Sequence, residues 1–190
     1  MKTKCLATLC LITALSGCGT TLLVAGATAG GAVLYDQRSA HTMVNDLKLA
    51  PHAKKIFSKD RDLFGQSDLQ FSSYNGTLLI TGQVSSQALQ TRISELASTI
   101  EGVQTVSNQT RITHHHEHHD AMKDTWISAK AKTKLLAQSG IPSNQFKIVT
   151  MDQVIYVLGL ASPGKTKKVI QSLAKLDGVK KIVSLVDHQN

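Results

Sequence analysis

Leu69–Val84 reads LQFSSYNGTLLITGQV, and this stretch decides the fold because it predicts a β-hairpin. An Asn-Gly pair at positions 75 and 76 separates two runs of alternating apolar and polar residues, and both of these residues accept the positive φ that a type I′ turn requires. Gly82 is expected to end the second strand at a bend. The side chains expected to face the core are Leu69, Phe71, Leu78 and Ile80.

Helical periodicity is present on both sides of the hairpin. A first helix is expected near Asp46–Ser58, with Pro51 in its opening turn, where a missing backbone N–H is tolerated. Ile56 and Phe57 would lie on the buried side of this helix. A second helix is expected over Ser85–Ile100, and Gly102 would end it before a third strand at Val103–Ile112. The inner side of the second helix would consist of Ala88, Ile93, Leu96, Ala97 and Ile100.

The second half of the chain repeats this order of elements. Phe146–Leu160, FKIVTMDQVIYVLGL, aligns with Leu69–Gln83 without a gap and pairs Gly82 with Gly159. An acid-Gly-Val triplet recurs at 101–103 and 177–179, which favours an internal duplication. Asp152-Gln153 replaces the Asn-Gly pair, so a different type of turn is expected there. The remaining elements of the repeat would be a helix at Lys167–Leu176 and a strand at Lys180–Val186.

Asp124–Ala137, DTWISAKAKTKLLA, opens the second repeat as a helix. At about 100° per residue, one apolar stripe contains Ile127, Ala131 and Leu135, and Leu136 would widen it. Asp124 or Thr125 would cap the N-terminus of the helix.

Trp126, the only Trp of the chain, lies outside this stripe. It projects roughly 100° away from Ile127, onto a side of the helix that carries cationic and small residues. An indole ring beside ammonium groups suits a membrane–water boundary. The alternative is that Trp126 covers a neighbouring loop or the other half of the protein. The candidate phospholipid-binding residues are Trp126, Lys123, Lys130, Lys134, Thr133 and Ala137.

Two copies of helix–strand–strand–helix–strand, each with a Gly at the end of the hairpin and a Gly-Val before the last strand, resemble tandem BON domains. The resemblance covers essentially the whole chain and is best over Asp124–Leu136 and Val154–Gly159. It implies an α+β fold in which each domain has a mixed three-stranded sheet covered on one face by two helices. It also implies binding of anionic phospholipid through the first helix of the second domain, where Trp126 matches the Trp of dual-BON outer-membrane lipoproteins.

The N-terminal residues predict export. Residues 1–18, MKTKCLATLCLITALSGC, contain a basic start, an apolar run and a small-residue cleavage site that ends in Cys. Leu-Ser-Gly-Cys resembles the bacterial lipobox, which would make Cys18 the lipidated first residue of the mature protein. Gly19 at the next position favours the outer membrane over the inner membrane. The alternative is an uncleaved anchor, since Cys5–Tyr35 carries no charge and is long enough to span a bilayer.

The composition limits the classes of partner. A formal net charge of +8 indicates a negatively charged partner. Export excludes nucleic acid and leaves an anionic phospholipid membrane, with an envelope protein as the rival. Cys5 and Cys10 would leave with the signal peptide, so a disulfide within one mature chain is excluded. No cofactor is expected, and the oligomeric state is not indicated by the sequence.

A His-rich string lies between the two repeats. Five imidazoles with two carboxylates in such a string could bind Zn²⁺, Ni²⁺ or Cu²⁺, but a linker lacks the fixed geometry of a structural metal site. A linker without a metal function is therefore the first interpretation, adventitious or weak metal binding comes second, and a metal buffer is a third, weaker functional hypothesis. The weak candidate ligands are His114, His115, His116, His118 and His119.

Catalytic motifs are not evident in the sequence. It contains no G-x-S-x-G elbow, and Ser162-Pro163-Gly164-Lys165 resembles a turn and not a phosphate-binding loop. A second basic group is read first as a solvated surface and second as accessory headgroup contacts; it comprises Lys165, Lys167, Lys168, Lys175, Lys180 and Lys181.

The sequence therefore predicts a non-enzymatic outer-membrane lipoprotein that binds anionic phospholipid and supports envelope integrity. The alternative is a periplasmic scaffold for an outer-membrane assembly protein or a regulator of peptidoglycan hydrolases. The expected organisation is a signal peptide at 1–17, a lipidated tether at 18–45, a first BON domain at 46–113, a His-rich linker at 114–122 and a second BON domain at 123–190.

Overall fold

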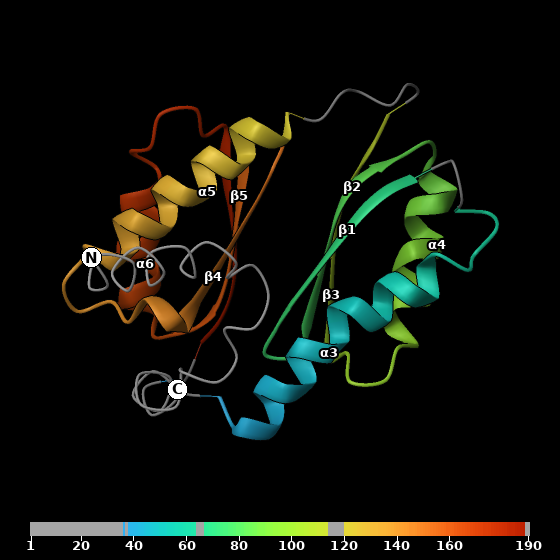
Figure 1. The fold of residues 1–190 in the computed structure, drawn as a ribbon, viewed down its shortest axis with the longest axis horizontal. Helices are drawn as coiled ribbons and strands as arrows, with labels where there is room; N and C mark the ends of the chain where they lie inside the picture. Colours follow the sequence, from blue (N-terminus) through green and yellow to red (C-terminus); the bar gives the residue numbers. More distant parts are fainter. Residues whose placement is uncertain (1–35, 37, 64–66, 114–119, 189–190) are drawn as a thin grey trace, which may run out of the picture. The chain divides into compact units, whose positions relative to one another are not determined.

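The computed structural model describes residue 36 and residues 38–63, 67–113 and 120–188. The first repeat consists of α3 (Ala40–Phe57), β1 (Ser67–Tyr74), β2 (Thr77–Val84), α4 (Gln87–Ser98) and β3 (Thr105–Ile112). The second consists of α5 (Ala121–Leu136), a short 3₁₀ helix η1 (Ser143–Gln145), β4 (Phe146–Met151), β5 (Val154–Leu160), α6 (Pro163–Leu173) and β6 (Lys181–Asp187). The predicted order of elements is confirmed in both repeats (Figure 1).

Each repeat forms a mixed three-stranded sheet with the second strand of its hairpin in the centre. β2 pairs with β1 antiparallel and with β3 in parallel, and β5 pairs in the same way with β4 and β6. Parallel pairing requires a crossover connection, which α4 and α6 supply. The two helices of each repeat cover one face of its sheet (Figure 1). The predicted α+β fold is therefore confirmed.

Each repeat has its own apolar core between its helices and its sheet. In the first repeat the core joins α3, β2 and α4 through residues that include Phe57, Ile80 and Ile93. Leu69 and Phe71 pack against this core from β1, as predicted. The second core joins α5, β5 and α6, with Leu135, Val157 and Val169 buried.

A third apolar cluster lies on the opposite faces of the two sheets and contains residues of both repeats: Tyr74, Leu79, Met151, Tyr156 and Leu158. Because of this cluster, every residue of β2 is buried. In a strand with one face open to solvent, buried and exposed residues would alternate. Tyr74 donates a hydrogen bond from its hydroxyl to the Gln145 carbonyl oxygen at 3.0 Å. Arg111 and Asp152 form an ion pair between the repeats with an N–O distance of 3.0 Å.

A buried carboxylate links the first helix of each repeat to the hairpin turn of that repeat. In the first repeat the two oxygens of Asp46 accept hydrogen bonds from the backbone N–H groups of Asn75 and Gly76, at 2.6 and 2.9 Å. In the second repeat Asp124 accepts from Asp152 and Gln153 at 2.6 and 2.8 Å. Hydrogen bonds to an ionised group are stronger than neutral ones, so each Asp fixes one helix against one turn.

The second hairpin turn differs from the expectation. Asp152 and Gln153 have φ values of 51° and 67°, and Asn75 and Gly76 have 50° and 72°. Both turns thus place two consecutive residues at positive φ, and the prediction of another turn type is wrong. Positive φ is unfavourable for a residue with a Cβ, and the two hydrogen bonds to Asp124 offset this cost.

Gly82 does not end its strand, in contrast to the prediction. β2 continues to Val84, and β5 continues past Gly159 to Leu160. A Cβ at Gly82 would lie 1.8 Å from the Asp68 carbonyl oxygen, and one at Gly159 would lie 2.7 Å from that of Gln145. Both glycines therefore permit close approach of a neighbouring backbone segment, β1 at Gly82 and the end of η1 at Gly159.

The first helix begins earlier than predicted. α3 starts at Ala40, and the Ser39 hydroxyl caps it by accepting a hydrogen bond from the Thr42 N–H at 3.0 Å. Pro51 consequently lies inside the helix and not in its opening turn. Pro51 is exposed, so water can reach the helix turn in which its hydrogen bond is missing.

The predicted inner side of α4 is correct for Ile93 and Ala97 and wrong for Ala88. Ala88 is exposed, and Leu89 is buried in its place. On a helix Leu89 lies about 40° from Ile93, whereas Ala88 lies about 140° away.

Replacement of Asp124 by Ala is expected to lower the free energy of unfolding of the second domain by about 3 kcal/mol, because two partly buried N–H groups lose a charged acceptor. Asp120→Ala is the matched control: it removes a carboxylate from the same helix that only caps its exposed N-terminus, and should cost about 1 kcal/mol. Urea unfolding followed by the fluorescence of Trp126 gives both values. Equal losses in the two variants would contradict the role given to Asp124.

Alkaline pH should weaken the fold through Tyr156. Burial raises the pKa of Tyr156. The nearby negative charge of Asp152 raises this pKa further, and the positive charge of Arg111 opposes the increase. The unfolded chain therefore releases this proton at a lower pH than the folded protein, so stability falls as the pH rises above about 10. Urea unfolding, followed by circular dichroism, gives the free energy of unfolding at pH 9 and pH 11. Between these two pH values, Tyr156→Phe should lose less of this free energy than the unchanged protein. An equal loss would contradict this account.

Candidate functional site

Three buried residues fix the orientation of α5. Ile127, Ala131 and Leu135 are at most 2% exposed and pack into the second core, as the predicted stripe requires. The N-cap is Asp120, whose carboxylate accepts a hydrogen bond from the Lys123 N–H at 3.0 Å. The prediction that Asp124 or Thr125 caps the helix is therefore wrong, because α5 begins at Ala121.

Asp124 also determines which way the helix faces. It is 4% exposed and lies on the sheet side of α5, bonded to the turn between β4 and β5. Trp126 is two residues further along, about 200° around the helix. The contact that buries Asp124 therefore turns Trp126 outward.

Trp126 and Lys130 form the centre of the exposed face of α5. The Trp126 side chain is 47% exposed, and the Lys130 Nζ lies 3.7 Å from the centroid of its ring. This distance is that of a cation–π contact between residues one helical turn apart. A flat aromatic surface and an ammonium group are thus presented together.

The alternative prediction, that Trp126 covers a neighbouring loop, holds for one edge of the ring. A Cβ at Gly178 would lie 3.8 Å from the Trp126 Cζ3 atom, so one edge of the ring lies beside the turn that precedes β6. Gly178 has a φ of 84°, as the acid-Gly-Val turn requires. Trp126 as a whole is still 47% exposed.

The other predicted site residues lie around Trp126 on the same helix. Lys123, Thr133 and Ala137 are exposed, and Lys134 is half-buried. At about 100° per residue they fall within about 80° of Trp126. The structure thus brings the six predicted residues together on one side of α5.

Two exposed apolar residues that were not among the predicted site residues complete this surface. Met122 is 85% exposed and precedes Trp126 by one helical turn, and this i, i+4 spacing was the available signal. Leu136 is 71% exposed, so the prediction that it widens the buried stripe is wrong. It lies about 180° from Ile127 around the helix.

The equivalent surface of α3 has a different character. Aligning Asp46 with Asp124 places Leu49, Ala53 and Phe57 at the buried positions of α5. The same alignment places Lys48 at the position of Trp126. The buried sides of the two helices are therefore alike, and only α5 carries an aromatic residue outward.

Other predicted sites are only partly covered by the structure. Cys18 and His114, His115, His116, His118 and His119 lie outside the described residues. In the part of the chain that is described, no group of three His, Cys, Asp or Glu side chains could hold a metal ion. No helix in that part is long and apolar enough to cross a bilayer.

The second basic group lies on α6 and around β6. Lys165 is half-buried, and the others, Lys167, Lys168, Lys175, Lys180 and Lys181, are exposed. This placement fits the solvated surface that was the first interpretation.

Residues 45–114 and 123–189 each match the BON domain family. The chain is 25% identical over 171 residues to the outer membrane lipoprotein DolP of Haemophilus influenzae, covering 90% of this chain and 88% of that protein. It is 28% identical to the 21 kDa hemolysin of Actinobacillus pleuropneumoniae, over 80% and 79% of the two chains. It is 29% identical to the osmotically-inducible protein Y of Escherichia coli, over 65% and 63%. The chain therefore belongs to the BON domain family and contains two BON domains.

Proposed function

We propose that this protein is a non-enzymatic outer-membrane lipoprotein, anchored through Cys18, whose second BON domain binds anionic phospholipid through α5. The observation that carries the proposal is the half-exposed Trp126 with the Lys130 ammonium 3.7 Å from its ring centroid. The similarity to DolP, whose name describes an outer membrane lipoprotein, supports the location. Support of envelope integrity would follow from this attachment.

The chemistry of the α5 surface fits the boundary between lipid and water. Trp126 and Met122 offer apolar surface to the acyl region. Lys123 and Lys130 offer positive charge at the headgroup level, where each Lys adds about 1 kcal/mol of attraction to an anionic leaflet. A lipid anchor at Cys18 would hold the second domain near the bilayer, and the basic, aromatic surface of α5 would add a second contact with it.

The rival function, a scaffold for an envelope protein, would use the same surface differently. A protein partner would bury Trp126 in a pocket and would not require an anionic bilayer. Binding to protein-free vesicles therefore separates the two functions.

Trp126→Ala is expected to weaken binding of residues 37–190 to phosphatidylglycerol vesicles about tenfold, which corresponds to about 1.4 kcal/mol. The reason is the loss of the apolar body of the indole ring at the lipid–water boundary. Val44→Ala is the matched control, because Val44 is an apolar residue of α3 with almost the same exposure as Trp126, 46% against 47%, and the change leaves the net charge unaltered. Co-sedimentation with vesicles measures both. Unchanged binding by Trp126→Ala, or equal weakening by Val44→Ala, would reject the assignment.

Charge reversal at Lys130 and Lys134 should weaken vesicle binding by at least about thirtyfold, because two attractive charges become repulsive. The pair Lys54→Glu with Lys55→Glu makes the same change in net charge on exposed residues of α3. It should have a much smaller effect if α5 is the contact surface. Binding of the unchanged protein should also decrease in 0.5 M salt. If the two double variants lose the same affinity, net charge and not the α5 surface controls binding.

A further inference from the structure

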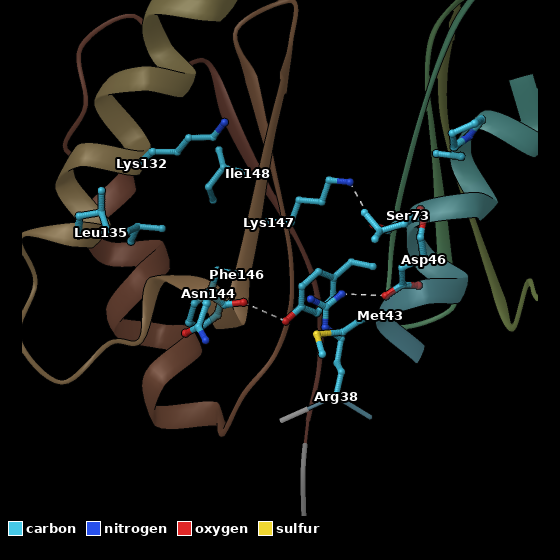
Figure 2. A pocket seen from close by; sticks show the side chains of 15 residues that line it. Arg38, Met43, Asp46, Ser73, Lys132, Leu135, Asn144, Phe146, Lys147 and Ile148 are labelled. Carbon is cyan, nitrogen blue, oxygen red and sulfur yellow. Dashed lines mark hydrogen bonds and ion pairs between the residues drawn. The ribbon is translucent and has the colours of Figure 1, made fainter. Parts of the chain in front are cut away.

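A pocket lies beside α3, α5 and β4, next to the surface of α5 that carries Trp126. Its volume is about 730 Å³, within the range of pockets that bind small molecules. Figure 2 shows the residues that line it. Both BON domains contribute: α3 and β1 from the first, and α5, η1 and β4 from the second.

Most of the lining is apolar. Leu47 and Leu136 line the pocket and are 76% and 71% exposed, so they present hydrocarbon to solvent as well as to the pocket. Leu135, Phe146 and Ile148 are buried and offer a hydrocarbon surface deeper in. An elongated apolar ligand would cover the exposed leucines, and about 25 cal/mol of stabilisation accompanies each Å² of apolar surface removed from water.

The charged residues of the pocket are mainly cations. Arg38, Lys132 and Lys147 line it together with a single acid, Asp46. Arg38 pairs with Asp46 at 2.8 Å and lies over the Tyr74 ring, 3.8 Å from the centroid. Once that pair is formed, the two lysines leave the lining with excess positive charge.

Lys147 is the more enclosed of the two lysines. Its Nζ donates a hydrogen bond to the Ser73 carbonyl oxygen at 3.1 Å, as the dashed line in Figure 2 shows. Burial lowers the pKa of Lys147; the carboxylate of Asp46 opposes this decrease, and Arg38 and Lys132 add to it. An anion in the pocket would favour the charged form of this ammonium group.

We propose that this pocket binds a single acyl chain with one anionic headgroup, such as a fatty-acid carboxylate or a lysophospholipid phosphate. The acyl chain lies along Leu47, Leu136 and Phe146, and the headgroup meets Lys132 and Lys147. Lys132 lies about 120° from Trp126 around α5, and Leu136, about 80° from Trp126, borders both this site and the proposed membrane contact. The pocket therefore gives the protein a second, soluble class of ligand that does not depend on bilayer binding.

The test uses residues 37–190, the compact unit that contains all three apolar clusters. Oleate labelled with ¹³C at its carboxyl group and oleoyl lysophosphatidylglycerol are each titrated below their micelle-forming concentrations, and binding is followed by NMR and calorimetry. Saturable binding of one molecule per chain is expected for at least one of them. Oleyl alcohol, which has the same chain without the charge, should bind about tenfold more weakly.

Two variants locate the ligand. Ala50→Trp fills the pocket from α3, and Lys132→Glu reverses a charge on an exposed residue; each should weaken oleate or lysolipid binding at least about tenfold. Trp126→Ala is the control and should bind the amphiphile within about twofold of the unchanged chain. If circular dichroism shows that Ala50→Trp does not fold, Lys132→Glu decides.

Absence of saturable binding would overturn the proposal. So would equal weakening by Trp126→Ala and Lys132→Glu, because that result would indicate adsorption to the outward face of α5. Vesicle binding by Ala50→Trp should remain unchanged, so failure of the pocket is distinguishable from failure of the membrane contact.

Discussion

The contact between a buried aspartate and a hairpin turn fixes each domain of this protein. Asp46 and Asp124 each accept hydrogen bonds from two consecutive backbone N–H groups of a turn whose residues have positive φ. A buried carboxylate is costly unless its charge is compensated by hydrogen bonds, so the rotation of the first helix is restricted to the one that places the Asp over the turn. In α5 this rotation buries Ile127 and turns Trp126 outward.

Duplication has preserved this framework and altered the surfaces. The buried positions of α3 and α5 are equivalent, yet Lys48 occupies the position of Trp126. The outer sheet faces share a third apolar cluster, in which Tyr156 stands at the repeat position of Leu79. One copy has thus kept a charged helix surface, whereas the other presents an aromatic one, and both copies contribute to the cationic, apolar pocket.

Local patterns in the sequence were sufficient for the first hairpin, the apolar stripe of α5 and the exposure of Trp126, because these depend on period and turn chemistry. The second hairpin was located by its alignment with the first. These local patterns were insufficient where the role of a residue depends on a partner that is distant in the sequence. Asp124 looked like a helix cap, but its partners are the backbone N–H groups at positions 152 and 153. Gly82 looked like a strand end, but the neighbouring Asp68 carbonyl group is what requires a glycine there. Leu136 was expected to widen the buried stripe, but it lies about 180° from Ile127 around α5 and is exposed. The pocket was not predictable at all, because its lining comes from both repeats.

The most direct test of the central claim uses Trp126 itself, the only Trp of the chain. Its emission is measured with phosphatidylglycerol vesicles that contain lipids brominated at defined depths of the acyl chain. The emission is expected to shift to shorter wavelength, with the strongest quenching by the shallowest bromines, because the ring would lie at the lipid–water boundary. Vesicle binding without any quenching of Trp126 would contradict the claim that this face of α5 contacts the membrane.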